Sequence, residues 1–231
     1  RDTDRSRGLG DVYKRQTLSR SDRNGKRKTR EQLSKRVPEL GYYFIVTDTK
    51  ETKQNYMYGL RDSTPQSIQE KLVIKVVRSR TVDLVDKAIS LAALNPQYSE
   101  VWIVFDRDQV KNFDNIISEA LKRGMHVGWS NPCIEIWFHA YFGSMPMFQT
   151  SVSCCNGFED CYEKKTEQKY LKSDMDIYRK LCLYGNEEKA IKIAIQRLKN
   201  QIKDGKDKPS EMISCTTVHE LINEIKSKLG D

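Results

Sequence analysis

Two aspartates, Asp106 and Asp108, follow directly on an apolar run at residues 101–105. Residues i and i+2 of an extended segment project to the same side, so the two carboxylates are expected to converge while Arg107 points away. Carboxylate oxygens are ligands that Mg²⁺ and Mn²⁺ take, with the remaining positions left to water and a phosphate oxygen. The pair therefore predicts a metal site. The alternative is that both residues only open a loop and cap the next helix, as Asp commonly does.

A second polar group lies in the segment S-N-P-C-I-E-I-W-F-H at residues 130–139. Asn131 is suited to cap a helix and Pro132 to occupy its first position. Glu135 and His139 interrupt an otherwise apolar stretch and share one helix face, which predicts that both are buried. A buried acid needs a partner. For Glu135 the partner could be a metal ion or an arginine, or Glu135 could have a catalytic role. The competing interpretation is that Glu135 pairs with His139 for a structural purpose.

Asp48 is the first acid after another apolar run, at residues 41–47. If the strand before it neighbours the strand before Asp106, its carboxylate would face the pair of aspartates. Acids from these three segments would form a magnesium site and leave one carboxyl group to act as a general acid or base. Taken alone, Asp48 is more typical of a turn or a helix cap than of a metal site.

A parallel sheet is needed to bring these residues together. Apolar runs of strand length alternate with helical patterns in the first two thirds of the chain, which indicates βαβ units and a sheet buried on both faces. Open sheets of this kind hold their ligands at the carboxyl ends of the strands. Further helical patterns predict a C-terminal helical region packed on or beside the sheet. Strands are expected at 41–47, 72–77, 101–105 and, more weakly, 125–129; helices at 53–60, 82–94, 113–123, 174–183, 187–202 and 218–228.

The chain has 231 residues and a formal net charge of +8, and the excess lies at its beginning. Residues 1–36 hold 13 of the 40 Lys and Arg but only 5 of the 32 Asp and Glu, so the rest of the chain is balanced. This composition predicts a disordered basic arm. The string at 11–16 resembles a translated sequencing adapter, which excludes residues 1–16 from the fold prediction. An α/β domain is expected at 37–143 and the helical region at 144–231.

The six cysteines form no C-x-x-C pair, and the three histidines are not placed to complete a zinc site, so structural zinc is not expected. Cys154, Cys155 and Cys161 lie in a polar segment, 150–165, that favours a surface loop. No apolar run approaches the ~20 residues of a membrane helix, and no secretory signal is found. We therefore expect reduced thiols, a cytoplasmic location and no membrane association.

Four segments in succession are similar to the RloB-like family, a prokaryotic group linked to restriction and phage-defence loci. They are F-I-V-T-D-T-K-E-T-K-Q-N-Y at 44–56, V-W-I-V-F-D-R-D at 101–108, the segment at 130–139 and T-T-V-H-E-L at 216–221. That family resembles topoisomerase–primase (TOPRIM) domains, whose sites combine a Glu after strand one with an Asp-x-Asp around Mg²⁺. The resemblance covers about residues 42–225 and implies a TOPRIM-like sheet. It also implies a site that includes Asp106, Asp108, Asn131, Glu135 and His139.

This chain departs from the family after strand one. The family usually has E-G-E-K-T-E-P-N-Y there, and the three acids are replaced by Asp48, Lys50 and Lys53. The shorter Asp48 would draw its carboxylate back, and reaction geometry tolerates such shifts poorly. Lys50 and Lys53 could hold phosphate instead, or Glu51 could substitute for the missing acid.

The resemblance implies an enzyme that uses Mg²⁺ or Mn²⁺ to hydrolyse phosphodiesters of RNA or DNA in prokaryotic anti-phage defence, by abortive infection. The alternative is a binding or sensor subunit that recognises a nucleotide, a nucleic acid or a partner protein of the same defence locus. The predicted catalytic residues are Asp48, Glu135 and His139, the metal ligands Asp106 and Asp108, and the nucleic-acid-binding residues Lys50, Lys53 and Asn131.

Overall fold

The computed structural model describes residues 41–48, 51–69, 72–94, 100–108 and 110–229. The predicted basic arm at 1–36 and Lys50 lie outside the described residues.

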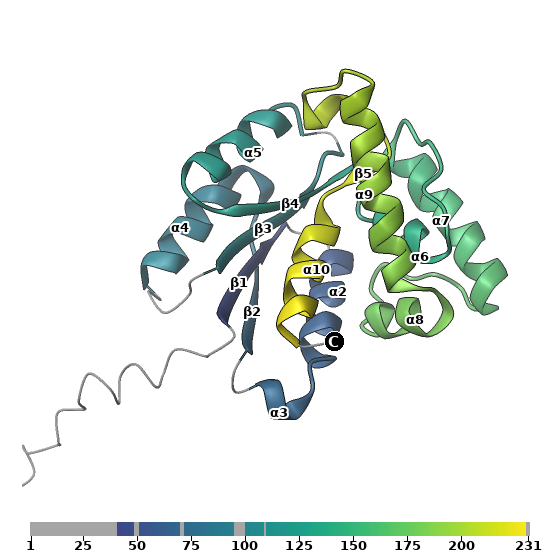
Figure 1. Ribbon diagram of the computed structural model, residues 1–231, viewed down its shortest axis with the longest axis horizontal. Coiled ribbons are helices and arrows are strands. Elements are labelled where there is room, and N and C mark those ends of the chain that lie inside the picture. Colours follow the sequence, from purple (N-terminus) through teal and green to yellow (C-terminus); the bar gives the residue numbers. More distant parts are fainter. Residues whose placement is uncertain (1–40, 49–50, 70–71, 95–99, 109, 230–231) are drawn as a thin grey trace, which may run out of the picture. The chain divides into compact units, whose positions relative to one another are not determined.

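A five-stranded sheet forms the centre of the described part of the chain (Figure 1). Its strands are β1 (Gly41–Thr47), β2 (Leu72–Arg78), β3 (Glu100–Asp106), β4 (His126–Asn131) and β5 (Cys215–Thr216). They lie in the order β2-β1-β3-β4-β5; the first four strands of the chain run parallel, and β5 pairs antiparallel with β4. The mixed α/β fold and the proximity of the first and third strands are therefore as predicted.

Helices cover the sheet and continue beyond it, and the predicted helical segments are confirmed with shifted ends. The α-helices of the described residues are α2 (Glu51–Asp62), α3 (Gln66–Gln69), α4 (Leu84–Leu94), α5 (Phe113–Lys122), α6 (Glu135–Tyr141), α7 (Ser151–Thr166), α8 (Ile177–Tyr184), α9 (Glu187–Lys203) and α10 (Val218–Leu229), with short 3-10 turns at Thr81–Asp83 and Pro209–Glu211. Helices α2 to α5 lie between the parallel strands, α6 follows β4, and α7 to α10 come after residue 150.

Successive residues of β1 enter two different hydrophobic cores, one on each face of the sheet. Phe44 and Val46 belong to the core that α4 and α5 cover. Tyr43 and Ile45 belong to the core that α2, α10 and other C-terminal helices cover, and Figure 1 shows these two groups of helices on opposite sides of the strands. Burial on both faces explains why the strands are continuous apolar runs in the sequence.

The C-terminal helices share a core with the sheet. α6, which precedes the predicted boundary at residue 143, packs against α7 and α9, which follow it. Trp137 of α6 belongs to the same hydrophobic cluster as Ile45 of β1 and Ala190 of α9.

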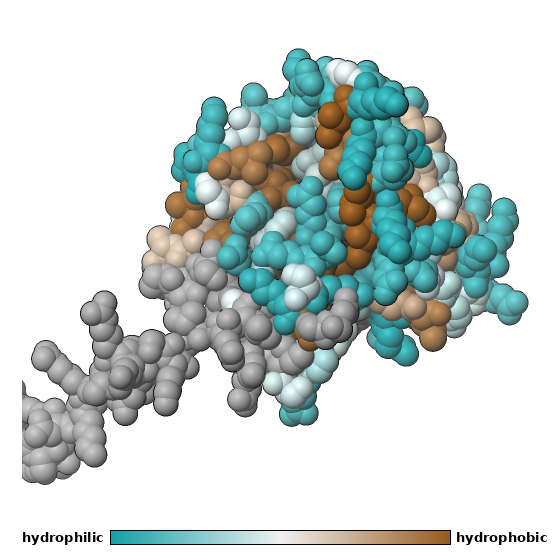
Figure 2. All heavy atoms as spheres, viewed as in Figure 1, coloured by the Kyte–Doolittle hydropathy of each residue, from teal (hydrophilic) through white to brown (hydrophobic). Residues whose placement is uncertain are grey.

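Figure 2 shows a largely hydrophilic face on which hydrophobic residues gather in a strip beside α9 and near α5. Within the described residues, no helix has the length and apolar character to cross a membrane.

The predicted start of α6 is wrong. Asn131 does not cap a helix and Pro132 does not open one: Ser130 and Asn131 still belong to β4, the peptide bond between Asn131 and Pro132 is cis, and the helix begins at Glu135. The strand continues because Ser130 and Asn131 pair with Thr216 and Cys215 of β5. The two residues of β5 are too few to show the apolar pattern of a strand. For this reason no strand was predicted after residue 143.

The prediction of a surface loop at 150–165 is also wrong, because these residues form α7 and its N-terminal cap. Thr150 and Ser153 make reciprocal capping hydrogen bonds at its beginning. Cys154, Phe158 and Tyr162, spaced by four residues, form a buried stripe in the core. Cys154 and Cys155 are therefore buried, and of the three cysteines only Cys161 keeps partial exposure.

Candidate functional site

A cavity of about 630 Å³ opens where β1, β3 and β4 end. Its lining comes from the first turn of α2, the end of β3 with the residues that follow it, the residues before α6 with its first turn, α7, and the segment between α7 and α8. Among the described residues its lining holds five carboxyl groups against two ammonium groups, which makes it an acidic pocket. The carboxyl groups are Glu51, Asp106, Asp108, Glu135 and Glu159, and the ammonium groups are Lys53 and Lys172.

Lys53 bridges two buried aspartates at the base of this acidic pocket. Its Nζ lies 2.5 Å from Oδ2 of Asp106 and 3.0 Å from Oδ1 of Asp48. Lys53 is fully buried because it shares the inward stripe of α2 with Tyr56 and Leu60. Burial by itself lowers the pKa of Lys53, but Asp106 and Asp48 outweigh it and raise that pKa above its ordinary value. The lysine therefore stays charged.

Asp106 lines the pocket, and only one of its two carboxylate oxygens is paired with Lys53. Its Oδ1 is buried and has no hydrogen-bond partner among the described residues. Burial raises the pKa of Asp106; Lys53 opposes the shift, and Asp48 and Glu135 add to it. A buried carboxylate oxygen without a hydrogen-bond partner, with further carboxylates around it, favours a cation. Asp106 thus fits the chemistry of a hard divalent metal ion.

Asp108 reaches the same pocket by a turn rather than by a continued strand. β3 ends at Asp106, and Asp108 has a positive φ of 35°. Its backbone N–H donates to the carbonyl of Pro132, and its Oδ1 accepts a 2.5 Å hydrogen bond from Ser151 Oγ. Both aspartates line the pocket, but Asp108 does so from a turn and not from the extended geometry on which their predicted convergence was based.

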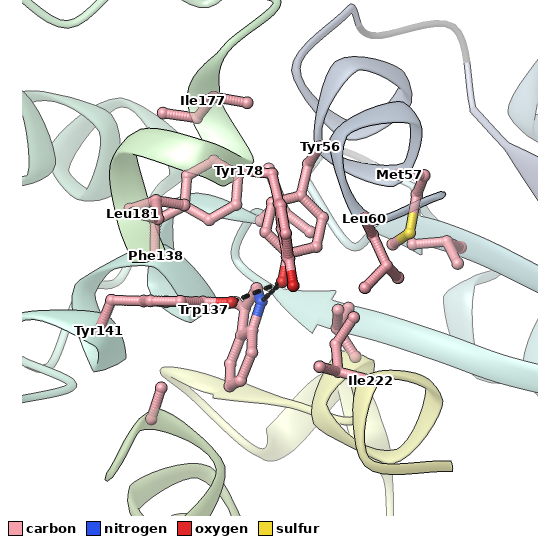
Figure 3. Packing of buried hydrophobic residues seen from close by; sticks show 14 of the residues in the cluster. Tyr56, Met57, Leu60, Trp137, Phe138, Tyr141, Ile177, Tyr178, Leu181 and Ile222 are labelled. Carbon is pink, nitrogen blue, oxygen red and sulfur yellow. Dashed lines mark hydrogen bonds between the residues drawn. The ribbon is translucent and has the colours of Figure 1, made fainter. Parts of the chain in front are cut away.

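Glu135 faces the pocket from α6, and the other side of α6 packs against α2 and keeps it there. Figure 3 shows Trp137 and Tyr141 directed at Tyr56 of α2; Trp137 Nε1 donates to Tyr56 Oη over 2.9 Å, and the hydroxyls of Tyr56 and Tyr141 lie 2.8 Å apart. These buried bonds fix how α6 is rotated. Glu135 itself is 3% exposed and accepts a hydrogen bond from the Tyr170 hydroxyl.

The charge of Glu135 is stabilised locally. Burial alone would raise the pKa of Glu135, but a hydrogen bond from Cys133 and the ammonium groups of Lys172 and Lys53 lower it. Lys172 Nζ lies 3.8 Å from Oε1 of Glu135. Glu135 is therefore a carboxylate at neutral pH and belongs to the negative wall of the pocket.

The match to known proteins agrees with the motifs. A family model described as RloB-like protein matches residues 43–225. The chain belongs to the RloB-like family. Every residue that lines the acidic pocket lies inside the matched segment. No curated protein and no solved structure matches the chain.

Not all predicted site residues of this RloB-like chain reach the pocket. Asp48 is 4% exposed, pairs with Lys53 and is not among the lining residues. His139 also lies outside the lining; it packs against Phe148 and Phe158, and burial lowers its pKa to about 4. The partners of Glu135 described above are Cys133, Tyr170 and Lys172. No hydrogen bond joins Glu135 to His139 in the described part of the chain.

The residues predicted to hold nucleic acid have other partners. Lys53 is enclosed between the two aspartates, and Lys50 lies outside the described residues. The Asn131 amide is buried and donates to the carbonyls of Pro209 and Ser210. In this conformation Asn131 joins the β4 end to the turn before β5.

Several lining residues of the RloB-like pocket were not predicted from the sequence. Ser151, Cys155 and Glu159 are spaced by four residues and form the face of α7 that lines the pocket. This spacing could have been noticed if 150–165 had been assigned as a helix. Lys172 lies between helices and has no sequence signal of its own. Glu51 was considered as a substitute acid, and it lines the pocket at the first turn of α2.

Proposed function

We propose that this RloB-like chain is a divalent-cation-dependent phosphodiesterase that acts on nucleic acid in prokaryotic anti-phage defence. The observation that carries the proposal is the buried Oδ1 of Asp106, which has no partner among the described residues and lies in a pocket rich in carboxyl groups. Asp106 and Asp108 would hold Mg²⁺ or Mn²⁺. The ion would supply neutralisation of the scissile phosphate and activation of a water.

The protein's own side chains prepare this site. Lys53 holds Asp106 through Oδ2 and leaves Oδ1 for a ligand. Ser151 orients Asp108, and Glu135 adds a third negative group on the pocket wall. Because these groups are fixed before a substrate binds, little reorganisation is needed during the reaction.

Glu51 is the acid best placed to move a proton. It lies at the first turn of α2, lines the pocket and is exposed to solvent. An exposed carboxylate can exchange its proton with water, which the enclosed Asp48 cannot do as readily while it is paired with Lys53. We therefore assign the role of general acid or base to Glu51 in place of Asp48.

A polyanionic substrate is supported by Lys172 and by the family motifs. Lys172 lines the pocket and its side chain is 56% exposed, so its ammonium is accessible to a phosphate. The Asp-Arg-Asp motif at 106–108 is similar to the Asp-x-Asp of TOPRIM-like nucleic-acid enzymes, and the segment around Glu135 is similar to the RloB-like family.

One observation favours a second function, that of a binding or sensor subunit. Lys53 already places a positive charge between Asp48 and Asp106, so one pair of carboxylate oxygens is not available to a metal. A pocket of this kind could recognise a nucleotide, a nucleic acid or a partner protein of the same locus without cleaving it.

A cleavage assay separates the two functions. The full chain is incubated with tRNA, single-stranded RNA and DNA in Mg²⁺, in Mn²⁺ and in excess chelator. An enzyme cleaves at least one substrate only with the divalent ion. Thermal stabilisation by Mg²⁺ without cleavage of any substrate would favour the sensor.

A further inference from the structure

Two cysteines and a glutamate converge on one wall of the acidic pocket, beside the aspartates. Cys133 and Glu135 come from the segment between β4 and the first turn of α6, and Cys155 comes from the second turn of α7. Their Sγ and carboxylate oxygen atoms all lie within 4.8 Å of one another. The packing of α6 against α7 brings the three together.

The separation of the two sulfurs fits a shared tetrahedral metal ion. Cys133 Sγ and Cys155 Sγ are 3.9 Å apart. Two thiolates with zinc–sulfur bonds of about 2.3 Å lie about 3.8 Å apart at a tetrahedral angle. A disulfide needs about 2.05 Å, so the two thiols are not bonded. Their 3.9 Å spacing, which is also that of a thiol–thiol hydrogen bond, matches two ligands of one ion.

A cation already lies beside two of these three groups. Lys172 Nζ lies 3.2 Å from Cys155 Sγ and 3.8 Å from Oε1 of Glu135. Its side chain is 56% exposed, so the ammonium can swing into solvent. Lys53, whose side chain is fully buried between two aspartates, has no such path. A dication can therefore displace Lys172 far more readily than Lys53.

We propose that Cys133, Cys155 and Glu135 bind a thiophilic divalent cation, Zn²⁺ in the first place, with a fourth coordination position open to the pocket. Soft thiolate ligands select zinc over magnesium, and three protein ligands with one open position are typical of zinc that binds a water or a substrate anion. Binding releases one proton from each thiol to the buffer and transfers the Lys172 ammonium to solvent. The site does not depend on phosphodiester cleavage at Asp106.

Cobalt(II) is a spectroscopic probe for this site. Titration of the reduced full chain with Co²⁺ is expected to give a thiolate-to-cobalt charge-transfer band that saturates at one ion per chain, and Zn²⁺ should remove it while excess Mg²⁺ should not. Cys133→Ser and Cys155→Ser should each lose the band. Cys161→Ser is the matched control, because Cys161 lies on the same helix and outside the pocket lining, and it should keep the band.

Alkylation of the wild-type thiols keeps the proposal testable if a variant does not fold. Zn²⁺ should protect Cys133 and Cys155 from iodoacetamide, as mapped by mass spectrometry, and should leave the exposed Cys182 reactive. A wild-type chain without the cobalt band, a band that survives Cys133→Ser or Cys155→Ser, or equal alkylation with and without Zn²⁺ would overturn the site. A chain that binds Co²⁺ but cleaves nothing would overturn only the phosphodiesterase.

Discussion

Lys53 Nζ lies 2.5 Å from Oδ2 of Asp106, and both side chains are almost completely removed from solvent. The ion pair joins the first turn of α2 to the end of β3, and the same ammonium holds Asp48 beyond β1. It gives the acidic pocket a buried cation and leaves Oδ1 of Asp106 without a hydrogen-bond partner among the described residues. The proposed metal chemistry depends on this division between the two oxygens of one carboxylate.

Removal of the Lys53 charge should destabilise the fold. Lys53→Met keeps most of the side-chain volume but removes the buried ammonium that Asp48 and Asp106 share, and removal of one partner of a buried ion pair typically costs about 3–5 kcal/mol. We expect that loss in the free energy of urea unfolding, and partial recovery when Mg²⁺ is added. Lys87→Met on the exposed face of α4 is the control. A loss below about 1 kcal/mol would mean that the bridge is not structural.

Mg²⁺ should stabilise the wild-type chain through Asp106. A ligand at 100 times its Kd contributes about 2.7 kcal/mol of stability, which corresponds to a rise in Tm of roughly 5–10 °C for a chain of this size. Asp106→Asn should abolish the rise. Glu119→Gln, which alters an exposed ion pair with Arg123 far along α5, should keep it. Equal shifts in both variants would place the bound ion elsewhere.

Glu51 and Asp48 should differ in what they contribute. Glu51→Gln is expected to lower kcat by about 100-fold, the usual effect of losing a general acid or base, with no change in the Mg²⁺ dependence of Tm. Asp48→Asn should lower the free energy of unfolding, because it removes one partner of Lys53. Parallel measurement of cleavage rate and urea unfolding separates the two, and full activity of Glu51→Gln would return the catalytic role to another acid.

His219 should make the fold sensitive to acid. The ring is buried on α10, with Nδ1 3.1 Å from the carbonyl oxygen of Thr216, and burial lowers its pKa to about 4. The unfolded chain, with a histidine pKa near 6.5, then binds the proton first as the pH falls. The stabilising contribution is therefore complete above about pH 6.5 and is lost between there and pH 4.

Replacement of His219 by a residue that does not titrate tests this directly. His219→Asn keeps a donor near the position of Nδ1. The fall in unfolding free energy from pH 7 to pH 4.5 should be about 2–3 kcal/mol smaller in this variant than in wild type. An identical fall in both proteins would show that His219 does not contribute.

The sheet and the acidic strand ends could be predicted because their signals are local. Continuous apolar runs gave the parallel strands, and Asp106 and Asp108 follow one of them directly. The role of Lys53 could not be predicted, because a lysine is normally exposed and its burial depends on Asp106, 53 residues away.

Two other features could not be predicted because they also depend on contacts between distant segments. The extension of β4 to Asn131 depends on a two-residue strand more than eighty residues later. The thiol pair depends on the packing of α6 against α7, which brings Cys133 to Cys155 across 22 positions of sequence. In both cases the decisive contact is between segments that no local pattern connects.

Cleavage by the double variant Asp106→Asn/Asp108→Asn is the most direct test of the proposed function. Wild type, the double variant and Glu119→Gln are compared on the same RNA or DNA substrate in Mg²⁺ and in excess chelator. We predict that the double variant loses activity by at least about 100-fold, that Glu119→Gln cleaves like wild type, and that chelator stops both active proteins. Cleavage by the double variant at the wild-type rate, or undiminished cleavage in chelator, would contradict the assignment of this pocket as a metal-dependent phosphodiesterase site.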